Sequence, residues 1–543
     1  MLQKLICSAT AIFIGFGLWK IGKHVVHQLA SPLRNINGPK STSWLFGNML
    51  ELLQSEELVL LDEWAQEYGQ TLKFYGFLNA VCLFTMDLRA LNHILTHSTE
   101  YQKPEPVRYG LSQILGKGVA FVVGAQHRQQ RRIMNPAFGP GQIRDLTEVF
   151  LAKSIKLRDI LMLESKDEEG NPKRIDISAW MSRVSLDVIG LAGFNYDINS
   201  LNASVKNNEL HEAIEMMLSA GISASVLSIL QIGIPPLRAI PTDRGRQIMF
   251  ARNIMRRIGH EILRDAKAAV MTSRDDEKGI VEKRSVQGRD LLSLLVRANM
   301  ATDVPDNQKL SDDDVLAQVH TFLVTGNDTV TTATTWALFA LTQHPEAQVK
   351  LRKELLTIES ETPSMDELSA LPYLDGVIRE ALRVYTPVPS SLRIAMKDDV
   401  IPLDTPFTDK NGEVQTEIKI IKGDYIAIPI LAINRSEALW GPDAKEFKPE
   451  RWESPPENAS NIPGIWGHLL TFLGGPRACI GYRFALIEMK ALLFTLVRAF
   501  EFTLAVPAAD IVKKVEVVQR PFVRSEPGSD SQMPLFIKPY RRA

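Results

Sequence analysis

Apolar residues recur at spacings of three and four along much of the chain, which is the pattern of helices that bury one face. This pattern predicts helices at 57–68, 126–135, 142–163, 209–230, 247–270, 311–342, 345–358 and 374–385. Short runs rich in β-branched and aromatic residues predict strands at 71–75, 80–85, 392–395 and 417–428, and from Phe500 onward. We therefore expect a mainly α fold with small β-sheets.

The N-terminal segment has a different pattern. Leu5–Trp19 carries no charge, with Lys4 before it and Lys20 and Lys23 after it. As a helix it spans ~22 Å, less than the ~30 Å of a bilayer core, so snorkelling lysines or a thin reticulum membrane must close the gap. We predict that residues 1–22 are a single-pass anchor in the endoplasmic reticulum membrane, with the rest of the chain cytoplasmic. A cleaved signal peptide is the alternative, although no small-residue cleavage site is evident.

A stretch rich in Pro and Gly follows this segment. Ser31-Pro32 and Asn37-Gly38-Pro39 do not continue a helix, so residues 23–45 are predicted to be a stiff connector. Residues 46–543 are then expected to form one large domain. Within it, residues 273–289 are dense in charge and indicate an exposed loop. A domain boundary at this loop is the alternative.

Composition and cysteine usage narrow the function classes. The formal net charge is −1, from 62 basic and 63 acidic residues, so the positive surplus of a nucleic-acid-binding protein is missing. No G-x-G-x-x-G or G-x-x-x-x-G-K-S/T string supports a nucleotide-binding core. The cysteines, Cys7, Cys82 and Cys479, have no C-x-x-C spacing. Cys82 is expected to be a buried apolar residue, and Cys7 belongs to the N-terminal apolar segment.

Cys479 lies in the segment Phe472–Gly481, a tight Gly/Pro turn ahead of a helix expected at 482–497. Free backbone N–H groups at a helix N-terminus stabilise a thiolate. Gly481 lets the backbone come close just after the sulfur. A cysteine in such a turn is usually inert, so its neighbours must decide its role.

The spacing F-x-x-G-x-R-x-C-x-G resembles the heme-binding loop of the cytochrome P-450 superfamily, and the resemblance extends over essentially the whole chain. It implies a single large P-450-like domain that holds heme b (iron protoporphyrin IX) through the thiolate of Cys479. It also implies that Arg477 pairs with a heme propionate and that Phe472 packs on the sulfur or the ring edge.

Two further motifs match the family. Glu380 and Arg383, three residues apart on one helix face, would otherwise be a surface pair worth a few tenths of a kcal/mol. In the family they form a buried network, and the segment 447–452 resembles the one that completes it through Arg451. The network is expected to be structural.

The family also has propionate donors in two other segments. His127 stands where the family often has Trp, and Arg131 follows it by four residues, so both lie on one helix face. His127 departs from the pattern, but it can still donate to a carboxylate. Arg393 resembles the third donor. The alternative is that His127 and Arg131 form a plain surface pair.

A fourth motif lies in the helix that Ser311 is expected to cap, at the string Thr325-Gly326-Asn327-Asp328-Thr329-Val330. The family pattern is A/G-G-x-D/E-T-T, so Thr325 and Val330 depart from it. Asp328 and Thr329, which the resemblance makes the proton-delivering pair, are retained. Four further threonines on this helix are expected to serve packing: Thr331, Thr332, Thr334 and Thr335.

The resemblance implies a monooxygenase that inserts one oxygen atom from O2 into a hydrophobic small molecule. The substrate is expected to be a terpenoid, another secondary metabolite or a fatty-acid-like compound of a fungal pathway, held by the apolar segments 109–122 and 216–230. Electrons would come from an NADPH-dependent cytochrome reductase that meets Arg128, Arg132 and Lys490. The alternatives are a heme-thiolate isomerase or dehydratase, and a non-catalytic heme-binding protein.

Overall fold

The computed structural model describes residues 15, 17, 19–55, 59–166, 170–202, 209–222, 226–276, 290–300, 309–515, 517–527 and 531–541. The chain divides into two compact units. Unit 1 consists of Met1–Pro104, Ser390–Ala432 and Gly474–Arg477, and unit 2 of Glu105–Pro389, Ile433–Leu473 and Ala478–Ala543. Both flanks of 273–289 belong to unit 2, so the alternative of a domain boundary at this loop is not supported.

Unit 1 is built on a five-stranded sheet with the order β1-β2-β8-β5-β3. Its strands are β1 (Thr71–Tyr75), β2 (Val81–Thr85), β3 (Tyr101–Gln102), β5 (Ser391–Ala395) and β8 (Tyr425–Ile428). β1 and β2 pair antiparallel from Thr71↔Thr85 to Tyr75↔Val81, and β2 pairs parallel with β8. Both strands of the hairpin are almost entirely buried because helices cover the sheet.

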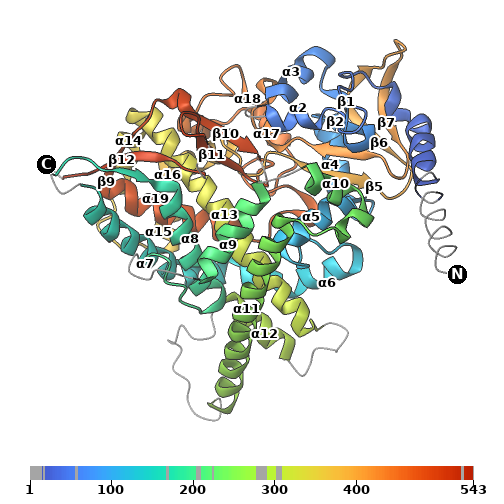
Figure 1. Cartoon of the computed structure of the whole chain (residues 1–543). Coiled ribbons are helices and arrows are strands. Elements are labelled where there is room, and N and C mark those ends of the chain that lie inside the picture. Colours follow the sequence, from blue (N-terminus) through green and yellow to red (C-terminus); the bar gives the residue numbers. More distant parts are fainter. Residues whose placement is uncertain are drawn as a thin grey trace. The chain divides into compact units, whose positions relative to one another are not determined.

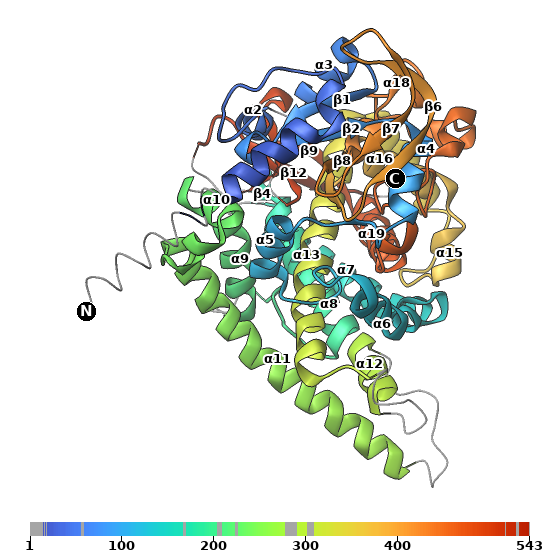
Figure 2. The ribbon, with the colours of Figure 1, turned by 90° about the vertical axis from the view of Figure 1, so that its right-hand side faces the viewer.

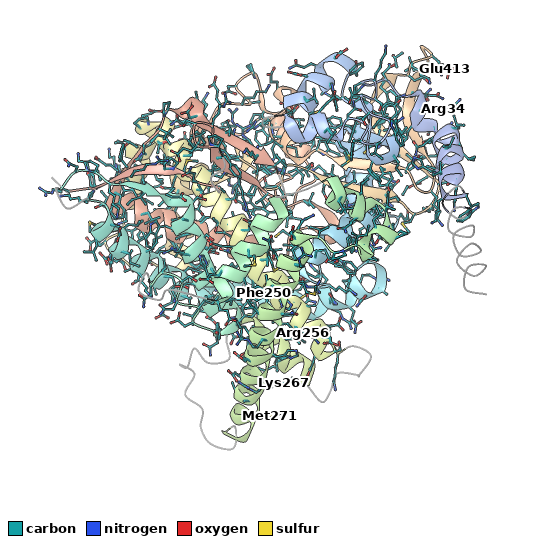
Figure 3. The ribbon with its side chains drawn as sticks, in the orientation of Figure 1. Arg34, Phe250, Arg256, Lys267, Met271 and Glu413 are labelled. Carbon is teal, nitrogen blue, oxygen red and sulfur yellow. The ribbon has the colours of Figure 1, made fainter. Side chains whose placement is uncertain are left out.

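Helices and a second hairpin complete unit 1. The helices are η1 (Pro32–Asn35), α2 (Met49–Gln54), α3 (Val59–Tyr68), η3 (Phe77–Asn79) and α4 (Leu88–Thr96), and the hairpin is β6 (Asp399–Thr408) with β7 (Val414–Ile420). Asp87 caps α4 by accepting a hydrogen bond from the Ala90 N–H. The hairpin contains Glu413 near its turn (Figure 3).

Unit 2 is mainly helical. Its helices are α5 (Glu105–Leu115), α6 (Gly124–Met134), α7 (Pro140–Glu164), α8 (Ile177–Phe194), α9 (Glu209–Ile222), α10 (Val226–Gly233), α11 (Asp243–Asp276), α12 (Leu291–Met300), α13 (Asp312–Gln343), α14 (Pro345–Leu355), α15 (Met365–Ser369), α16 (Pro372–Val384), α18 (Glu437–Trp440) and α19 (Tyr482–Ala499). The 3-10 turns are η4 (Asn135–Phe138), η5 (Pro235–Ala239), η7 (Pro449–Glu453), η8 (Glu457–Asn461) and η10 (Ala508–Asp510). The short helix α17 (Ile430–Asn434) follows β8, and η9 (Gly475–Arg477) belongs to unit 1.

Helix α13 is the central element of unit 2. It packs against α8, α16 and α19, and Figures 1 and 2 show it running through the helices of this unit. The long helix α11 lies beside α9 and α13, and its exposed face carries Phe250 and Met271 (Figure 3). Two small sheets join the same unit, β4-β12-β9 and β10-β11. Their strands are β4 (Arg174–Asp176), β9 (Phe500–Leu504), β10 (Ile511–Val515), β11 (Gln519–Val523) and β12 (Pro534–Pro539).

The predicted helices and strands are confirmed, except that two of the predicted ranges each contain two separate elements. The range 209–230 holds two helices, α9 and α10, separated by residues outside the described part. The single strand predicted at 417–428 is wrong, because Gly423 (φ 104°) and Asp424 form a turn that divides it into β7 and β8. Eight helices in the described part of the chain were not predicted: α2, α4, α5, α8, α12, α15, α17 and α18. Helix α8 is buried on nearly every side, so its sequence has no polar face to mark a helical period.

The predicted network of Glu380, Arg383 and Arg451 is buried. Glu380 and Arg383 are 0% exposed and Arg451 is 7% exposed. Arg383 Nη2 donates to Glu380 Oε1 at 2.8 Å, and Arg451 Nε donates to the same oxygen at 3.2 Å. Main-chain carbonyls of Asn434 and Glu446 accept further hydrogen bonds from Arg383. The helix α16 is thereby fixed to the segment that follows α17.

The anchor predicted at 1–22 lies mostly outside the described residues. No helix in the described part of the chain combines the length and the apolar character that a membrane crossing needs. Residues 19–30 are helical and are held to the rest of unit 1 by polar side chains. His24 bonds to the Leu78 carbonyl at 2.8 Å, and Gln28 accepts from the Val81 N–H at 2.8 Å.

The buried network generates a prediction about stability. Arg451→Ala leaves Glu380 with one buried partner fewer, so the free energy of unfolding is expected to fall by ~3–5 kcal/mol. Lys350→Ala is the matched control, because the Lys350–Glu450 pair is roughly half exposed and its loss is expected to cost less than ~1 kcal/mol. Denaturant unfolding of both variants checks this, and equal losses would contradict it.

Candidate active site

The loop before α19 presents Cys479 through a fixed backbone. Leu473 (φ 57°) and Gly475 (φ 67°) both have left-handed conformations. A side chain at Gly475 would meet the Leu95 carbonyl oxygen of the same unit at 2.3 Å, so this position requires glycine. The Cys479 N–H donates to the Phe472 carbonyl at 2.9 Å, which closes the turn. Phe472 also packs edge-on against the Trp466 ring.

The Cys479 side chain is closely surrounded by protein atoms but is accessible to solvent. Burial raises its pKa, while the Gly481 N–H and the Arg131 guanidinium act in the opposite direction. Its side chain is nevertheless accessible, whereas Cys82 is 3% exposed and burial raises the pKa of its thiol well above the usual range. The interpretation of Cys82 as a core residue is confirmed. Of the two cysteines that the structure describes, Cys479 is the one that is accessible.

Two predicted residues of α6 lie in unit 2 with this cysteine. Arg131 Nη1 donates to the Ala478 carbonyl at 2.6 Å and its Nε to Asn135 Oδ1 at 3.0 Å. Arg131 therefore holds the backbone next to Cys479 directly, which the sequence did not predict. His127 is 5% exposed, so the surface-pair alternative is wrong for it.

Gly481 occupies the N-cap position of α19. A Cβ added at Gly481 would lie 3.7 Å from the Phe138 ring, an ordinary contact. Protein atoms alone therefore do not require glycine here. The predicted close approach of the backbone just after the sulfur stays a prediction.

Unit 1 contains three positively charged side chains, those of Lys103, Arg393 and Arg477, that lie close enough for their charges to interact. Arg393 is 2% exposed, its Nη2 has no hydrogen-bond partner, and burial lowers its pKa to about 10. The pKa of Lys103 falls to about 7, first because of burial and then because of the positive charges of Arg393 and Arg477. Buried cations that repel one another favour an anionic ligand. Sequence reasoning missed Lys103, since a lone lysine before a proline carries no recognisable signal.

Helix α13 is capped as predicted, with Ser311 accepting from the Asp314 N–H at 3.1 Å. The Thr329 hydroxyl donates to the Thr325 carbonyl at 2.7 Å, the backbone contact expected for threonine within a helix. Gly326 packs against Ile189 of α8, whose side chain would be 3.1 Å from an added Cβ. Asp328 is 8% exposed, burial raises its pKa, and it accepts a hydrogen bond from Arg520 Nη2 at 2.7 Å.

The predicted basic surface for a reductase needs one correction. Arg128 and Arg132 are exposed on α6. Lys490 is 5% exposed and its Nζ lies 2.9 Å from Asp375 Oδ1, so the prediction that it meets a partner protein is wrong. A lysine in a helix sequence gives no sign of whether an acid from another helix covers it.

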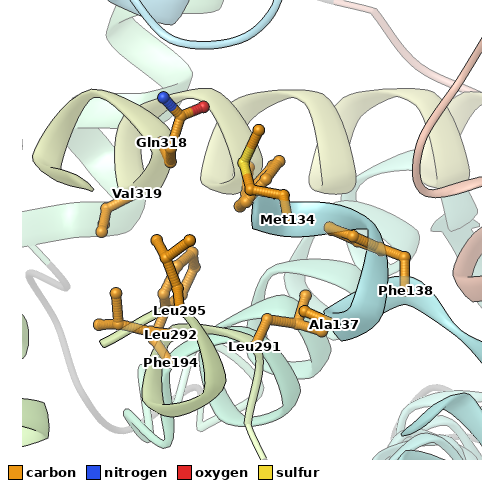
Figure 4. A pocket seen from close by; sticks show the side chains of 10 residues that line it. Met134, Ala137, Phe138, Phe194, Leu291, Leu292, Leu295, Gln318 and Val319 are labelled. Carbon is orange, nitrogen blue, oxygen red and sulfur yellow. The ribbon is translucent and has the colours of Figure 1, made fainter. Parts of the chain in front are cut away.

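A small apolar cavity lies among α12, α13, the end of α8 and η4 (Figure 4). It has a volume of about 10 Å³ and is lined by Met134, Ala137, Phe138, Phe194, Leu291, Leu292, Leu295, Gln318, Val319 and Phe322. This volume suits one small group only. The cavity is a packing defect rather than a substrate pocket.

Comparison with known proteins identifies the family to which the chain belongs. A sequence model of the Cytochrome P450 family matches residues 37–522. The chain belongs to the cytochrome P450 family. It is 56% identical to cytochrome P450 monooxygenase 205 of Postia placenta over 99% of this chain and 98% of that protein. It is 50% identical to cytochrome P450 monooxygenase 128 of the same fungus, covering 98% of each chain. It is also 35% identical to cytochrome P450 monooxygenase claQ of Ampulloclitocybe clavipes, covering 96% of each.

The family membership makes the chain a heme-dependent monooxygenase that receives electrons from NADPH through a reductase. These relatives favour a monooxygenase over the isomerase and the non-catalytic heme protein. The residues fit a heme, because an accessible thiol at a helix N-terminus suits iron and the buried cations of unit 1 suit carboxylates. When bound, the heme supplies oxygen activation that no protein side chain provides.

Proposed function

We propose that this P450 oxidises a hydrophobic secondary metabolite, with Cys479 as the iron ligand. The observation that carries the assignment is the Cys479 thiol itself, which is deep in unit 2, accessible, and faced by the Gly481 N–H. Phe472, which packs against the Trp466 and Tyr482 rings beside this loop, lines the edge of the bound heme. Gly481 keeps the backbone after the sulfur free of a side chain.

The heme propionates are the anions that the buried cations require. In unit 1, Arg393 and Arg477 act with Lys103, whose positive charges repel one another until a carboxylate is present. In unit 2, His127 and Arg131 add two donors from one face of α6. Arg131 also orients the loop next to the sulfur, since it donates a hydrogen bond to the Ala478 carbonyl.

Asp328 and Thr329 deliver protons. The overall reaction consumes one substrate molecule, one O2, two electrons and two protons, and yields one hydroxylated product and one water. The Thr329 hydroxyl is held by the Thr325 carbonyl, so its oxygen lone pairs remain available to a proton donor or water. The buried carboxyl of Asp328 has a raised pKa, which suits a group that takes up and releases protons.

The substrate class follows from the apolar segments 109–122 and 216–230. The described residues of these segments include Leu111, Ala120 and Met216, which are partly buried against the core of unit 2. Apolar walls of this kind suit a terpenoid or a fatty-acid-like chain rather than a charged metabolite. Difference spectra on addition of a sesquiterpene, a fatty acid and a charged sugar phosphate distinguish these classes.

The membrane attachment rests on the N-terminal helix. Residues 1–22 anchor the protein in the endoplasmic reticulum membrane, 23–45 form the connector, and 46–543 the cytoplasmic catalytic domain. In the described helical part, His24, His27 and Gln28 face unit 1, while the opposite face is apolar and exposed. The exposed residues are Trp19, Ile21, Val25, Val26 and Leu29. A helix with its apolar face outward suits a lipid surface.

The reductase meets the exposed arginines of α6. Arg128 and Arg132 lie four residues apart, so their side chains share one face of this helix. A pair of exposed cations suits an acidic partner surface, and the attraction weakens with added salt.

The proton role of Thr329 is tested by Thr329→Ala. This variant is expected to consume NADPH at a rate similar to the unchanged enzyme, but to release most of the electrons as peroxide rather than product, because proton delivery is no longer timed. Thr331→Ala is the control on the same helix, since the Thr331 hydroxyl bonds to Asn327 at 3.3 Å. Product and peroxide are measured per NADPH, and unchanged coupling in Thr329→Ala removes the role.

The role of Lys103 is tested by Lys103→Gln. Removal of one cation is expected to speed heme loss to a heme-scavenging protein severalfold and to shift the reduction potential, because a propionate loses a partner. Lys397→Gln is the control in the same unit, since Lys397 pairs with Glu100 and its side chain is 56% exposed. If both variants retain heme equally well, Lys103 is not a propionate ligand.

A further inference from the structure

One face of helix α5 gathers positive charge. Glu105, Arg108 and Tyr109 share this face, because residues three and four apart are neighbours on a helix. Two further arginines come from η5 and from the first turn of α11. The Cζ atom of Arg238 lies 3.7 Å from the centre of the Tyr109 ring, and Arg244 lies within electrostatic reach of the same tyrosine. Three arginines are thus grouped at the first turns of α5.

The carboxylate of this group is already paired with one of the arginines. Arg238 Nη1 and Nη2 donate to the two oxygens of Glu105 at 2.8 and 3.1 Å, which is the parallel arrangement that arginine and carboxylate prefer. Arg244 is partly buried, and burial lowers its pKa. Three arginines and one glutamate leave this group with a surplus of positive charge.

Arg108 is the arginine of this group whose hydrogen bonds are incomplete. Its Cζ atom lies 5.5 Å from the centre of the Phe121 ring, so an aromatic face covers one side of the guanidinium. Its Nε atom is buried, and no described residue accepts a hydrogen bond from it. Buried polar groups in proteins are nearly always hydrogen-bonded, so an acceptor from a ligand is expected at this position.

Helix α5 leads from this arginine to the helix that carries the proposed proton pair. It packs against α10 and α13 (Figure 2). At its far end the Leu115 carbonyl accepts a hydrogen bond from the Thr321 hydroxyl at 2.9 Å, one turn before Thr325 on α13. The rise from Arg108 to Leu115 is ~10 Å. The arginine therefore lies at the start of the apolar segment 109–122, and this segment continues to α13.

We propose that Arg108 binds a carboxylate at one end of the substrate, so that the substrate is an apolar carboxylic acid. The guanidinium donates hydrogen bonds to the carboxylate oxygens, as Arg238 does to Glu105, and Arg238 and Arg244 add positive charge around the anion. The apolar part of the substrate extends along segment 109–122, so the oxidised carbon is remote from the carboxylate. Fatty acids and terpenoid acids have this chemistry. This inference rests on the proposed hydrophobic substrate and on the role of segment 109–122.

The test measures binding by isothermal titration calorimetry with the full-length protein at neutral pH. Its ligands are two matched pairs, dodecanoic acid with dodecanol and farnesoic acid with farnesol. The unchanged protein is expected to bind the acid of at least one pair about tenfold or more tightly than the alcohol, because a charge-assisted pair forms. Added salt is expected to weaken binding of the acid and to leave binding of the alcohol unchanged.

The variants assign this preference to one side chain. Arg108→Gln is expected to remove most of the preference for the acid without changing the affinity for the alcohol. Arg108→Lys keeps the charge but loses the planar fork, so it is expected to retain part of the preference. Arg144→Gln is the matched control, because it removes an exposed arginine of the same unit that pairs with Asp366 at 3.0 Å. Neither affinity is expected to change in this control.

The outcomes separate the explanations. Equal binding of acid and alcohol in the unchanged protein overturns the proposal, as does an Arg108→Gln protein that keeps the full preference for the acid. If Arg108→Gln does not fold, an Arg108→Lys protein with an undiminished preference overturns it equally. If neither acid nor alcohol of either pair binds, the proposed hydrophobic substrate itself fails and this inference falls with it, a result recognisable without any Arg108 variant.

Discussion

The rest of the structure depends on one cysteine, Cys479, whose thiol is closely surrounded by protein atoms and is yet accessible to solvent. Burial raises the pKa of Cys479, so the protein alone favours the protonated thiol. The Gly481 N–H and Arg131 reduce this penalty without removing it. A metal cation completes the balance, because thiolate is the form that binds iron. Burial of this thiol therefore lowers the stability of the fold until the cofactor is bound.

The same reasoning applies to the cations of unit 1. The charges of Arg393 and Arg477 lower the pKa of Lys103, and burial lowers the pKa of Arg393. A structure built for stability alone would not gather three positive charges around a buried arginine. The cations of unit 1 therefore suit a carboxylate ligand, just as the thiol of unit 2 suits iron.

The scaffold explains how strained parts are held. Leu473 adopts a left-handed conformation, which a residue with a Cβ keeps only where surrounding contacts fix it. On the far side of the loop, α19 packs along α7, and the buried Glu380 and Arg383 bind the chain that leads into the loop. Helix α13 is fixed against α8 by Gly326, where any side chain would press on Ile189. Both functional segments thus depend on helices that carry no chemistry themselves.

The sequence predicted what depends on local pattern. Amphipathic helices, the cap at Ser311 and the spacing around Cys479 are local signals, and they indicated the fold and the heme loop. It did not predict what depends on tertiary packing. Helix α8 has no polar face, Lys103 and Arg520 belong to no motif, and the burial of Lys490 follows from Asp375 on another helix. Such partners lie far apart in the chain, so no window of sequence contains them.

The carbon monoxide difference spectrum of the reduced protein tests the central claim most directly. If Cys479 binds the iron through its thiolate, the unchanged protein gives the absorption band of a thiolate-ligated heme, and Cys479→Ser loses that band while Cys82→Ser keeps it. A Cys479→Ser protein with the same spectrum and turnover as the unchanged enzyme, or a purified protein without porphyrin, would contradict the account.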